Sequence, residues 1–427
     1  MMKRLFLVVT VFLLIGGLVQ AETIRLLMES VPDTRYIQEL LPQFKAETGI
    51  DVDMEVISYI DMHSKLVPQL VSPKGSYDAI VVDFYWVGEF TKAGWLMSLD
   101  DLVKRDNFDT GVYVPKLIEL VGRVDNTLYM LPFYNYSMAI IYRKDMIEDP
   151  KEQAAFKAKY GMDLKIPQTW DDYWKQVEFF SRDTNNDGKT DMFGTVIQGQ
   201  RGDCISMQWS NYLYAQGGQY NDSNWNPTLN SAAGVAALTA YREALQKFSP
   251  PGSESYCFDE GFNVLAQGKA FSLQTFNIMF AGFEDPESSK VVGKVAITPN
   301  PGGGLNGAWG WAIPKSSPNK EAAWKFLKWV ESYEIAKKRA LLGGAPTQTK
   351  IFVDPEVVAA RSYYPILGKI LAGAQQFPVF TYTTQLVEEM GRELNLAATG
   401  EKDVKEALDA SAEAFRKLLI KDGKLAK

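Results

Sequence analysis

Residues 183–191, with the sequence DTNNDGKTD, place an oxygen-bearing side chain at nearly every second position. That spacing is typical of a calcium loop of the EF-hand kind, in which alternate residues supply oxygen ligands and a glycine makes the sharp turn. Gly188 stands at the turn, whereas Gly194 occupies the twelfth position, where an EF-hand has its bidentate Glu. The candidate ligands are Asp183, Asn185, Asp187, Lys189 (through its carbonyl group) and Asp191. The pattern predicts a structural calcium ion, and the alternative is a turn held by its own Asp and Asn side chains.

Carboxylates and aromatic rings follow several predicted strands, where ligands of open α/β sheets bind. Sugars need this mixture, because their C–H faces pack on aromatic rings and their hydroxyl groups pair with carboxylates, amides and Arg. The candidate substrate-binding residues are Glu29, Asp33, Arg35, Asp83, Tyr85, Trp86, Tyr134, Asn135, Tyr136, Phe276, Trp309 and Trp311. Within this set the stacking candidates are Trp86, Tyr134, Trp309 and Trp311, and the hydroxyl partners are Glu29, Asp83 and Asn135. The alternatives are core packing for any one aromatic ring and helix capping for Asp33 and Arg35.

Motifs for nucleophilic, phosphate or metal chemistry are missing from the sequence. There is no nucleophile elbow, no phosphate loop and no cluster of metal-ligating histidines, and the only histidine is His63, beside a predicted helix start. No cofactor is therefore required. A secreted enzyme that cuts carbohydrate with two carboxylates remains an alternative function, since acidic residues are plentiful.

The elements that would position the candidate residues alternate between strands and helices. Residues 23–29 (TIRLLME) read as a short buried strand, and residues 50–58 alternate apolar and polar side chains as a half-buried strand does. Residues 35–50 lie between them and have apolar side chains at helical spacing. Residues 77–83 (YDAIVVD) are a continuous apolar run typical of a parallel strand. This rhythm indicates an α/β fold with a mostly parallel sheet.

Two later segments have signals for the start of a helix. Thr169 is followed three residues later by Asp172, which is a variant of the capping box. Ser317 precedes Pro318 and predicts a second capped helix over residues 316–332.

The N-terminus has the features of a secretory signal peptide. Lys3 and Arg4 precede an apolar run, and Val19-Gln20-Ala21 is a small-residue cleavage site. The run is shorter than the ~20 apolar residues that span a membrane, so a membrane anchor is the weaker alternative. No Cys lies near the cleavage site, which argues against a lipid anchor. We predict that residues 1–21 are a signal peptide and that the mature chain is free in the periplasm.

The chain is acidic, with 45 Lys and Arg against 52 Asp and Glu in 427 residues and a formal net charge of −7. This balance argues against nucleic acid and anionic membrane surfaces as partners. The length suits two or three domains. In an oxidising compartment Cys204 and Cys257 could form one disulfide, a question that the sequence leaves open.

Several segments together resemble the solute-binding proteins of ABC sugar importers, the large family that includes maltose-binding protein. They are YDAIVVDFYWVGEFTKAGWLMSLDDLV (77–103), LYMLPFYNYSMAIIYRKDMI (128–147), IPQTWDDYW (166–174) and GWAIPKSSPNKEAAWKFLKWV (310–330). Each segment alone is a weak signal, but the set occurs in the expected order. The resemblance runs from about Thr23 to Leu419, nearly the whole mature chain.

The resemblance implies an α/β, two-lobed periplasmic-binding-protein-like fold (type II), in which each lobe is a mixed, mostly parallel sheet flanked by helices. Hinge crossings are expected near Leu131–Ser137, Pro299–Gly303 and Leu342–Pro346. The N-terminal lobe would then comprise residues 22–134 and 300–344. The C-terminal lobe would comprise residues 135–299 and 345–427.

The resemblance also implies a function. The chain would be the substrate-binding component of an ABC transporter, a monomer that traps a carbohydrate or polyol between its lobes and delivers it to the membrane permease. One alternative is the enzyme described above. Another is a protein of the same fold for a non-sugar solute, such as a polyamine, a metal or a peptide. Arg35 or Arg201 in the cleft would permit an acidic sugar.

Overall fold

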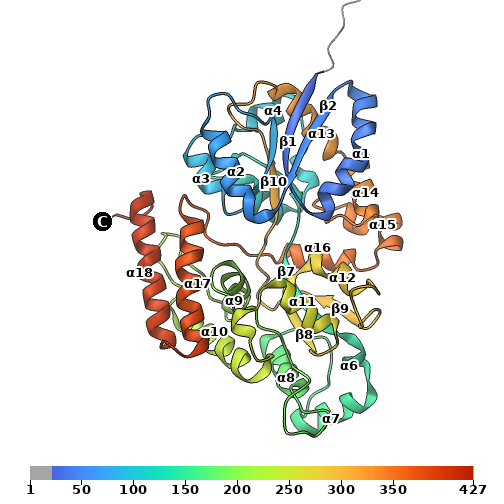
Figure 1. The fold of residues 1–427 in the computed structure, drawn as a ribbon, viewed down its shortest axis with the longest axis vertical. Coiled ribbons are helices and arrows are strands. Elements are labelled where there is room, and N and C mark those ends of the chain that lie inside the picture. The colour runs from blue at the N-terminus through green and yellow to red at the C-terminus, as the bar shows by residue number, and fades with distance from the viewer. Residues whose placement is uncertain (1–21, 427) are drawn as a thin grey trace, which may run out of the picture.

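The computed structural model describes residues 22–426 and divides them between two lobes (Figure 1). The predicted signal peptide, residues 1–21, lies outside the described residues. No helix within the described part of the chain is long and apolar enough to cross a membrane. The two-lobed α/β fold that the sequence predicts is confirmed.

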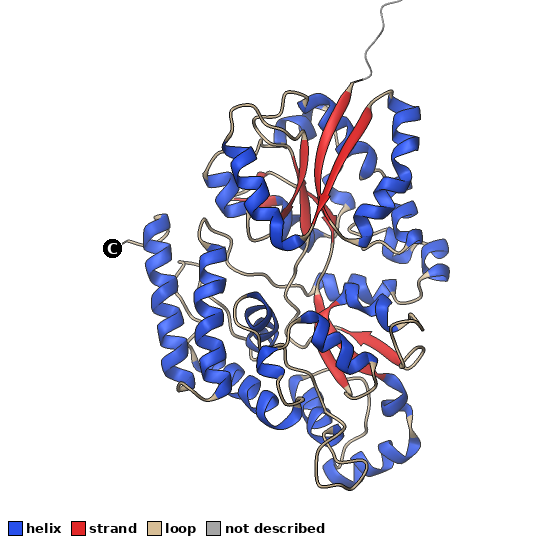
Figure 2. Ribbon diagram, viewed as in Figure 1, coloured by secondary structure: helices blue, strands red, loops and turns tan. Residues whose placement is uncertain are grey.

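The N-terminal lobe is built on a five-stranded sheet with the strand order β2-β1-β3-β10-β6 (Figure 2). β1 pairs in parallel with β2 and β3, and β10 runs antiparallel to β3 and β6. The strands are β1 Thr23–Glu29, β2 Asp51–Ile57, β3 Ala79–Asp83, β6 Leu131–Tyr134 and β10 Trp309–Ala312, with a separate hairpin of β4 Arg123–Val124 and β5 Thr127–Leu128. The helices of this lobe are α1 Pro32–Thr48, α2 Tyr59–Val71, α3 Val87–Lys92, α4 Asp100–Arg105, α5 Pro115–Leu117, α13 Lys320–Val330, α14 Tyr333–Leu342 and α15 Pro355–Ala360.

The C-terminal lobe has a smaller, three-stranded sheet with the order β8-β7-β9. Its strands are β7 Met138–Arg143, β8 Ser272–Phe276 and β9 Val295–Thr298. Its helices are α6 Lys144–Glu148, α7 Pro150–Tyr160, α8 Trp170–Phe180, α9 Asp203–Ala215, α10 Ala232–Glu243, α11 Phe258–Ala266, α12 Phe280–Phe283, α17 Thr383–Thr399 and α18 Val404–Asp422. α16 Tyr364–Ala372 lies at the junction and contacts both β9 and α5.

The sheet of the C-terminal lobe corrects one expected detail, because β7 is antiparallel to both of its neighbours. We expected a mostly parallel sheet in each lobe. Both β7 and β8 are buried along nearly their whole length, and a strand covered on both faces reads as an apolar run whichever way its neighbours point. The apolar pattern therefore could not show whether neighbouring strands run parallel or antiparallel.

The chain crosses between the lobes at Asn135–Ser137, between β6 and β7, and again between β9 and β10. After α14 it stays on the N-terminal lobe for longer than the expected boundary at residue 345. The Val114 amide donates to the Thr347 carbonyl, the Thr349 amide donates to Val112, and α15 packs on α14. Residues 347–360 therefore contact the N-terminal lobe, although the expected division assigns them to the other lobe.

Candidate ligand-binding site between the lobes

A cavity of about 620 Å³ lies between the two lobes. The N-terminal lobe and the crossings contribute Glu29, Val31, Tyr59, Asp83, Phe84, Tyr136, Gly307 and Trp309 to its wall. The C-terminal lobe contributes Gln200, Asp203, Cys204, Met207, Cys257, Phe258, Asp259, Glu260, Phe276, Ile278 and Met279. A cavity of this size, with aromatic walls and a few polar groups, suits a small organic ligand.

Two buried carboxyl groups enter the cavity from neighbouring strands. Glu29 is the last residue of β1 and Asp83 is the last residue of β3. Because β1 and β3 are parallel neighbours, their carboxyl ends meet at the same edge of the sheet, which is the edge that faces the other lobe.

Glu29 is 8% exposed and accepts a hydrogen bond from the Tyr134 hydroxyl group. Burial raises the pKa of Glu29 to about 7, although the bond from Tyr134 acts in the opposite direction. Asp33 adds a smaller upward contribution to the pKa of Glu29. At neutral pH this carboxyl group is therefore close to half protonated.

Asp83 is 3% exposed, and its Oδ1 atom has no hydrogen-bond partner within the described part of the chain. Burial raises the pKa of Asp83 well above its ordinary value, and the nearby carboxyl groups of Glu29 and Asp203 raise it further. A buried acceptor without a partner is costly in a folded protein. Its position on the cavity wall makes Asp83 a group that a ligand can satisfy.

Aromatic rings form the apolar part of the cavity wall. Trp309 is the first residue of β10, and its ring centroid lies 5.9 Å from that of Tyr59 and 5.2 Å from that of Trp86. On the opposite lobe Phe276 packs against Phe258, with 5.4 Å between their centroids. Rings on both sides of one cavity can pack on the two faces of a flat solute.

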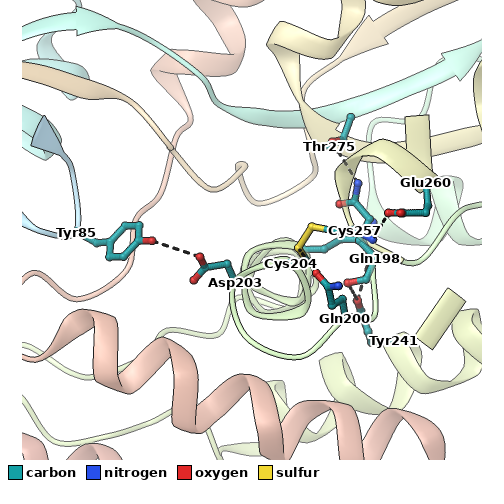
Figure 3. The surroundings of a disulfide bond; sticks show 10 residues. Tyr85, Gln198, Gln200, Asp203, Cys204, Tyr241, Cys257, Glu260 and Thr275 are labelled. Atoms are coloured by element: carbon teal, nitrogen blue, oxygen red, sulfur yellow. Dashed lines mark hydrogen bonds between the residues drawn. A yellow bond between two sulfur atoms is a disulfide. The ribbon is translucent and has the colours of Figure 1, made fainter. Parts of the chain in front are cut away.

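The second lobe presents the starts of two helices to the cavity, joined by a disulfide (Figure 3). Cys204 is the second residue of α9, and Cys257 directly precedes α11. The Cα atoms of the two cysteines are 5.4 Å apart. The bond thus fixes the spacing of two helix N-termini, where negative charge is stabilised by the helix dipole.

Asp203, the first residue of α9, reaches toward the other lobe. The Tyr85 hydroxyl group donates a long hydrogen bond of 3.5 Å to Asp203 Oδ2, as Figure 3 shows. Tyr85 follows β3, so this contact joins the two sides of the cleft. Burial raises the pKa of Asp203 to about 6, and the charge of Glu388 contributes in the same direction.

Five of the predicted site residues line the cavity, and the structure places the others behind it or away from it. The lining residues are Glu29, Asp83, Tyr136, Phe276 and Trp309. Tyr134 stacks on Tyr136 at 4.1 Å and supports Glu29, and Trp86 packs behind Trp309.

Two polar residues of the predicted set have other partners. Asp33 is fully buried and accepts hydrogen bonds from the Tyr136 hydroxyl group and the Ala345 amide. Asn135 donates to the Pro346 carbonyl at a crossing. These two side chains hold the chain segments that support the cavity.

Trp311 and Arg35 were predicted to bind the substrate, but neither residue lines the cavity. Trp311 is 0% exposed, and its indole nitrogen donates to Glu331 in the core of the N-terminal lobe. Two residues along a strand correspond to about 6.6 Å, which moves Trp311 away from the sheet edge that Trp309 occupies. Arg35 lies exposed on α1, where its guanidinium group rests on the Tyr36 ring.

Among the described residues, neither of the two arginines that were predicted to permit an acidic sugar lies in the cavity. Arg201 donates to Asn395 in a neighbouring pocket, and neither Arg201 nor Arg35 lines the cavity. Within residues 22–426 no Lys, Arg or His contributes to the cavity wall.

Several lining residues were missed by sequence reasoning, namely Tyr59, Phe84, Gln200, Asp203, Phe258, Asp259 and Glu260. Asp203, Asp259 and Glu260 stand in the first turns of α9 and α11. The signal that could have found them is the pair of cysteines, because a bond between Cys204 and Cys257 brings exactly those two helix starts together.

The loop at residues 183–191 is closed by its own side chains. Asp183 accepts hydrogen bonds from the Asn185, Asn186 and Gly188 amides, and Asp187 accepts one from Lys189. The Asp191 carboxylate accepts from Thr184. Within residues 22–426, no three His, Cys, Asp or Glu side chains form a group that could hold a metal ion. These hydrogen bonds match the alternative turn, and the calcium ion stays a prediction.

Two α/β lobes around a cavity with carboxylates and aromatic rings define a solute-binding protein of the two-lobed class. The sequence profile of the bacterial extracellular solute-binding proteins matches residues 29–337 of this chain. The match covers more than half of the chain, and the protein belongs to that family.

Two curated relatives align over most of their length. A probable amino-acid ABC transporter periplasmic-binding protein of Sinorhizobium fredii is 27% identical over 381 residues, which are 87% of this chain and 84% of the relative. A mannitol-binding protein of Pseudomonas aeruginosa is 25% identical over 326 residues, which are 74% of this chain and 70% of the relative.

Solved structures show the same architecture. An ABC transporter solute-binding protein of Agrobacterium radiobacter K84 in complex with ribitol has a TM-score of 0.78 and 27% identity, covering 93% of this chain and 98% of that chain. Maltose-bound MalE3 of T. maritima also has a TM-score of 0.78, at 24% identity, and covers 93% of this chain and 100% of that chain. At 24% identity, the similarity to MalE3 shows a shared fold and nothing about function.

Proposed function

We propose that this protein is the substrate-binding component of an ABC importer, and that it captures a carbohydrate or polyol in the periplasm and delivers it to a membrane permease. The observation that carries the proposal is the interlobe cavity, in which carboxylates and aromatic rings from both lobes face one space. Two relatives are named for mannitol and for erythritol or L-threitol, and a structural relative was solved with ribitol.

The geometry suggests how a solute would be held. A sugar or polyol packs a C–H face on Trp309 or Phe276 and donates hydroxyl hydrogens to Glu29 and Asp83. The protein changes no covalent bond in this scheme, so the solute leaves as it entered. The protein acts as a monomer without a required cofactor.

Closure follows from the position of the cavity between the lobes. A solute that contacts both lobes binds the closed form more tightly than the open form, and only that difference in affinity shifts the equilibrium. The closed form would then be the shape that the permease recognises.

Calorimetric titration with mannitol, ribitol, sorbitol, maltose and a set of monosaccharides tests the proposal. At least one of them should bind with a Kd in the micromolar range or below, and mass spectrometry should recover it unchanged. The proposal fails if no carbohydrate or polyol binds, or if the recovered compound has been cleaved.

A further inference from the structure

The charged groups of the cavity are all of one sign. Five carboxyl groups line it: Glu29, Asp83, Asp203, Asp259 and Glu260. Within the described residues the buried cation Arg339 is paired elsewhere, at 2.9 Å from Glu331 and 4.0 Å from Asp33. No positively charged side chain of residues 22–426 shares the cavity with the five carboxyl groups.

Three of the five carboxyl groups have a structural explanation. Asp203 is the first residue of α9, and Asp259 and Glu260 lie in the first turn of α11. Glu260 also accepts the Cys257 amide hydrogen at the helix start. Negative charge is favourable at these positions with or without a ligand.

Glu29 and Asp83 lack such an explanation. Both are at least nine-tenths buried at the carboxyl ends of strands. Glu29 accepts one hydrogen bond, from Tyr134, and Asp83 Oδ1 accepts none within the described part of the chain. Without a counter-ion, burial disfavours the ionised form of both groups and raises the pKa of each. A cationic ligand would supply the charge that they lack.

The balance of donors and acceptors indicates what the ligand supplies. A bound cation would favour the ionised form of Glu29 and Asp83, and a carboxylate only accepts hydrogen bonds. The Tyr136 hydroxyl hydrogen is already donated to Asp33. Few other lining residues have a side chain that can donate, namely Tyr59, Gln200 and Trp309. A solute with hydroxyl groups alone brings as many acceptors as donors, whereas an ammonium group brings three donors and no acceptor.

The aromatic rings beside the carboxyl groups also favour a ligand with a positively charged group. Tyr59 and Trp309 both line the cavity, with 5.9 Å between their centroids. The face of an aromatic ring attracts a cation, and most strongly when water is excluded. Within residues 22–426 no trio of acidic, His or Cys side chains is placed to hold a metal ion, so an organic cation fits this wall better than a metal does.

We infer that the solute is a hydroxylated compound with a protonated amine, an amino sugar or an amino polyol, whose ammonium group lies against Glu29 and Asp83. This inference rests on the proposed function and narrows it. The aromatic rings hold the carbon skeleton, the hydroxyl groups reach the second lobe, and the ammonium group pairs with the two buried carboxylates.

The test compares matched pairs that differ only in one amine. Calorimetric titrations use D-glucosamine with D-glucose, D-galactosamine with D-galactose, and 1-amino-1-deoxy-D-glucitol with D-glucitol; D-glucuronate and putrescine complete the panel. In at least one pair the amine should bind ten times or more tighter than its hydroxyl counterpart, and D-glucuronate should not bind. Asp83→Asn should reduce that preference at least tenfold, with Glu29→Gln as a second variant if Asp83→Asn does not fold.

A surface variant controls for the overall charge. Asp171 lies on α8, where its exposed side chain pairs with Lys175, and Asp171→Asn removes one negative charge without touching the cavity. This variant should keep the full preference. Equal or tighter binding of the neutral partner in every pair overturns the inference and leaves the proposed function standing. Binding of putrescine alone overturns the inference that the solute is hydroxylated. Binding of no compound in this panel also overturns the inference, whereas the proposed function is decided by the titrations with mannitol, ribitol and maltose.

Discussion

Trp309 and Trp311 stand two positions apart on β10 and have different surroundings. Trp309 lies on the cavity wall, whereas Trp311 is enclosed by the core and donates its indole hydrogen to Glu331. The distinction depends on how far each residue lies from the end of the strand. Substitutions at the two positions should therefore separate ligand binding from stability.

Trp309→Ala is expected to weaken binding of the solute at least tenfold, about 1.4 kcal/mol, because it removes a ring from the cavity wall. Trp311→Phe is the matched control. It removes one donor from the buried Glu331, which keeps its bond from Arg339, and should lower the free energy of unfolding by about 1–3 kcal/mol, with affinity unchanged. Titration and urea unfolding of both variants measure the two effects. Equal losses of affinity in the two variants would contradict the placement of these rings.

The raised pKa of Glu29 predicts how stability depends on pH. Because its pKa rises from 4.5 to about 7 on folding, the folded state binds more protons than the unfolded state between those values. The free energy of unfolding must then fall as pH rises through this window, by about 3 kcal/mol for a shift of this size. Asp203, with a pKa of about 6, acts in the same direction.

The unliganded protein should accordingly be more stable at pH 5 than at pH 7.5 in urea unfolding. Glu29→Gln removes one of the titrating groups, so it should make the profile less steep and raise stability at pH 7.5. A profile that rises with pH in this window, or one that Glu29→Gln leaves unaltered, would contradict the burial of this carboxyl group.

At the scale of elements, the disulfide is the covalent link between two walls of the cavity. It joins the starts of α9 and α11 across a sequence separation of 53 residues. A loop of that length gives about 4 kcal/mol of stabilisation in the chain-entropy description. The double variant Cys204→Ser/Cys257→Ser should lose stability of that order. It should also bind solute more weakly, because both helix starts line the cavity.

A melting curve measures the stability of the double variant, and a titration measures its affinity for the solute. Both are compared with the parent protein after chemical reduction of its disulfide. Reduced and substituted protein should behave alike. Unchanged affinity in both would show that the helix starts keep their places without the bond.

The loop at residues 183–191 is a separate element, outside the cavity wall. A calcium ion bound there should raise the melting temperature of the protein, and EDTA should lower it again. Asp187→Ala would remove the response, whereas Asp171→Ala, on the exposed face of α8, would keep it. A melting temperature that ignores both calcium and EDTA assigns the loop to the turn formed by its own hydrogen bonds.

Elements with strong local signals could be predicted from the sequence. The capping box at Thr169 and Asp172 is present at the start of α8. Ser317 was expected to cap the next helix, but α13 begins at Lys320, and Ser317 donates its hydroxyl hydrogen to Asp78 instead. A buried carboxylate from another part of the chain decided that position, and no local pattern reports such a partner.

Part of the candidate site could be predicted from the rule that ligands bind at the ends of the strands in an α/β sheet. Glu29, Asp83 and Trp309 lie at sheet ends, and the rule that ligands bind there located all three on the cavity wall. The second lobe's wall comes from helix starts that the disulfide and the tertiary fold bring together. Residues such as Asp203 are close to Glu29 only in the folded protein, and sequence spacing does not encode that distance.

At the scale of the whole molecule, the lobes contact each other through Tyr85 and Asp203 and through the rings of Phe84 and Phe377, whose centroids are 6.1 Å apart. The hydrogen bond spans the cleft, and it is long at 3.5 Å, so it contributes little by itself. We expect the free protein to open despite these contacts, and a solute that bridges the lobes would then hold the closed form.

Small-angle scattering should therefore show a decrease in the radius of gyration when solute is added. Tyr85→Phe removes the contact while keeping the ring, and it should shift the free protein toward the open form. Affinity should fall by about tenfold at most, because the variant also loses the hydrogen bond between the Tyr85 and Tyr59 hydroxyl groups, and one hydrogen bond contributes about 0.5–1.5 kcal/mol. With saturating solute the variant and the parent protein should reach the same compact dimensions. A variant that binds solute yet fails to compact would show that closure depends on the Tyr85 contact and not on the solute, which contradicts the proposed mechanism.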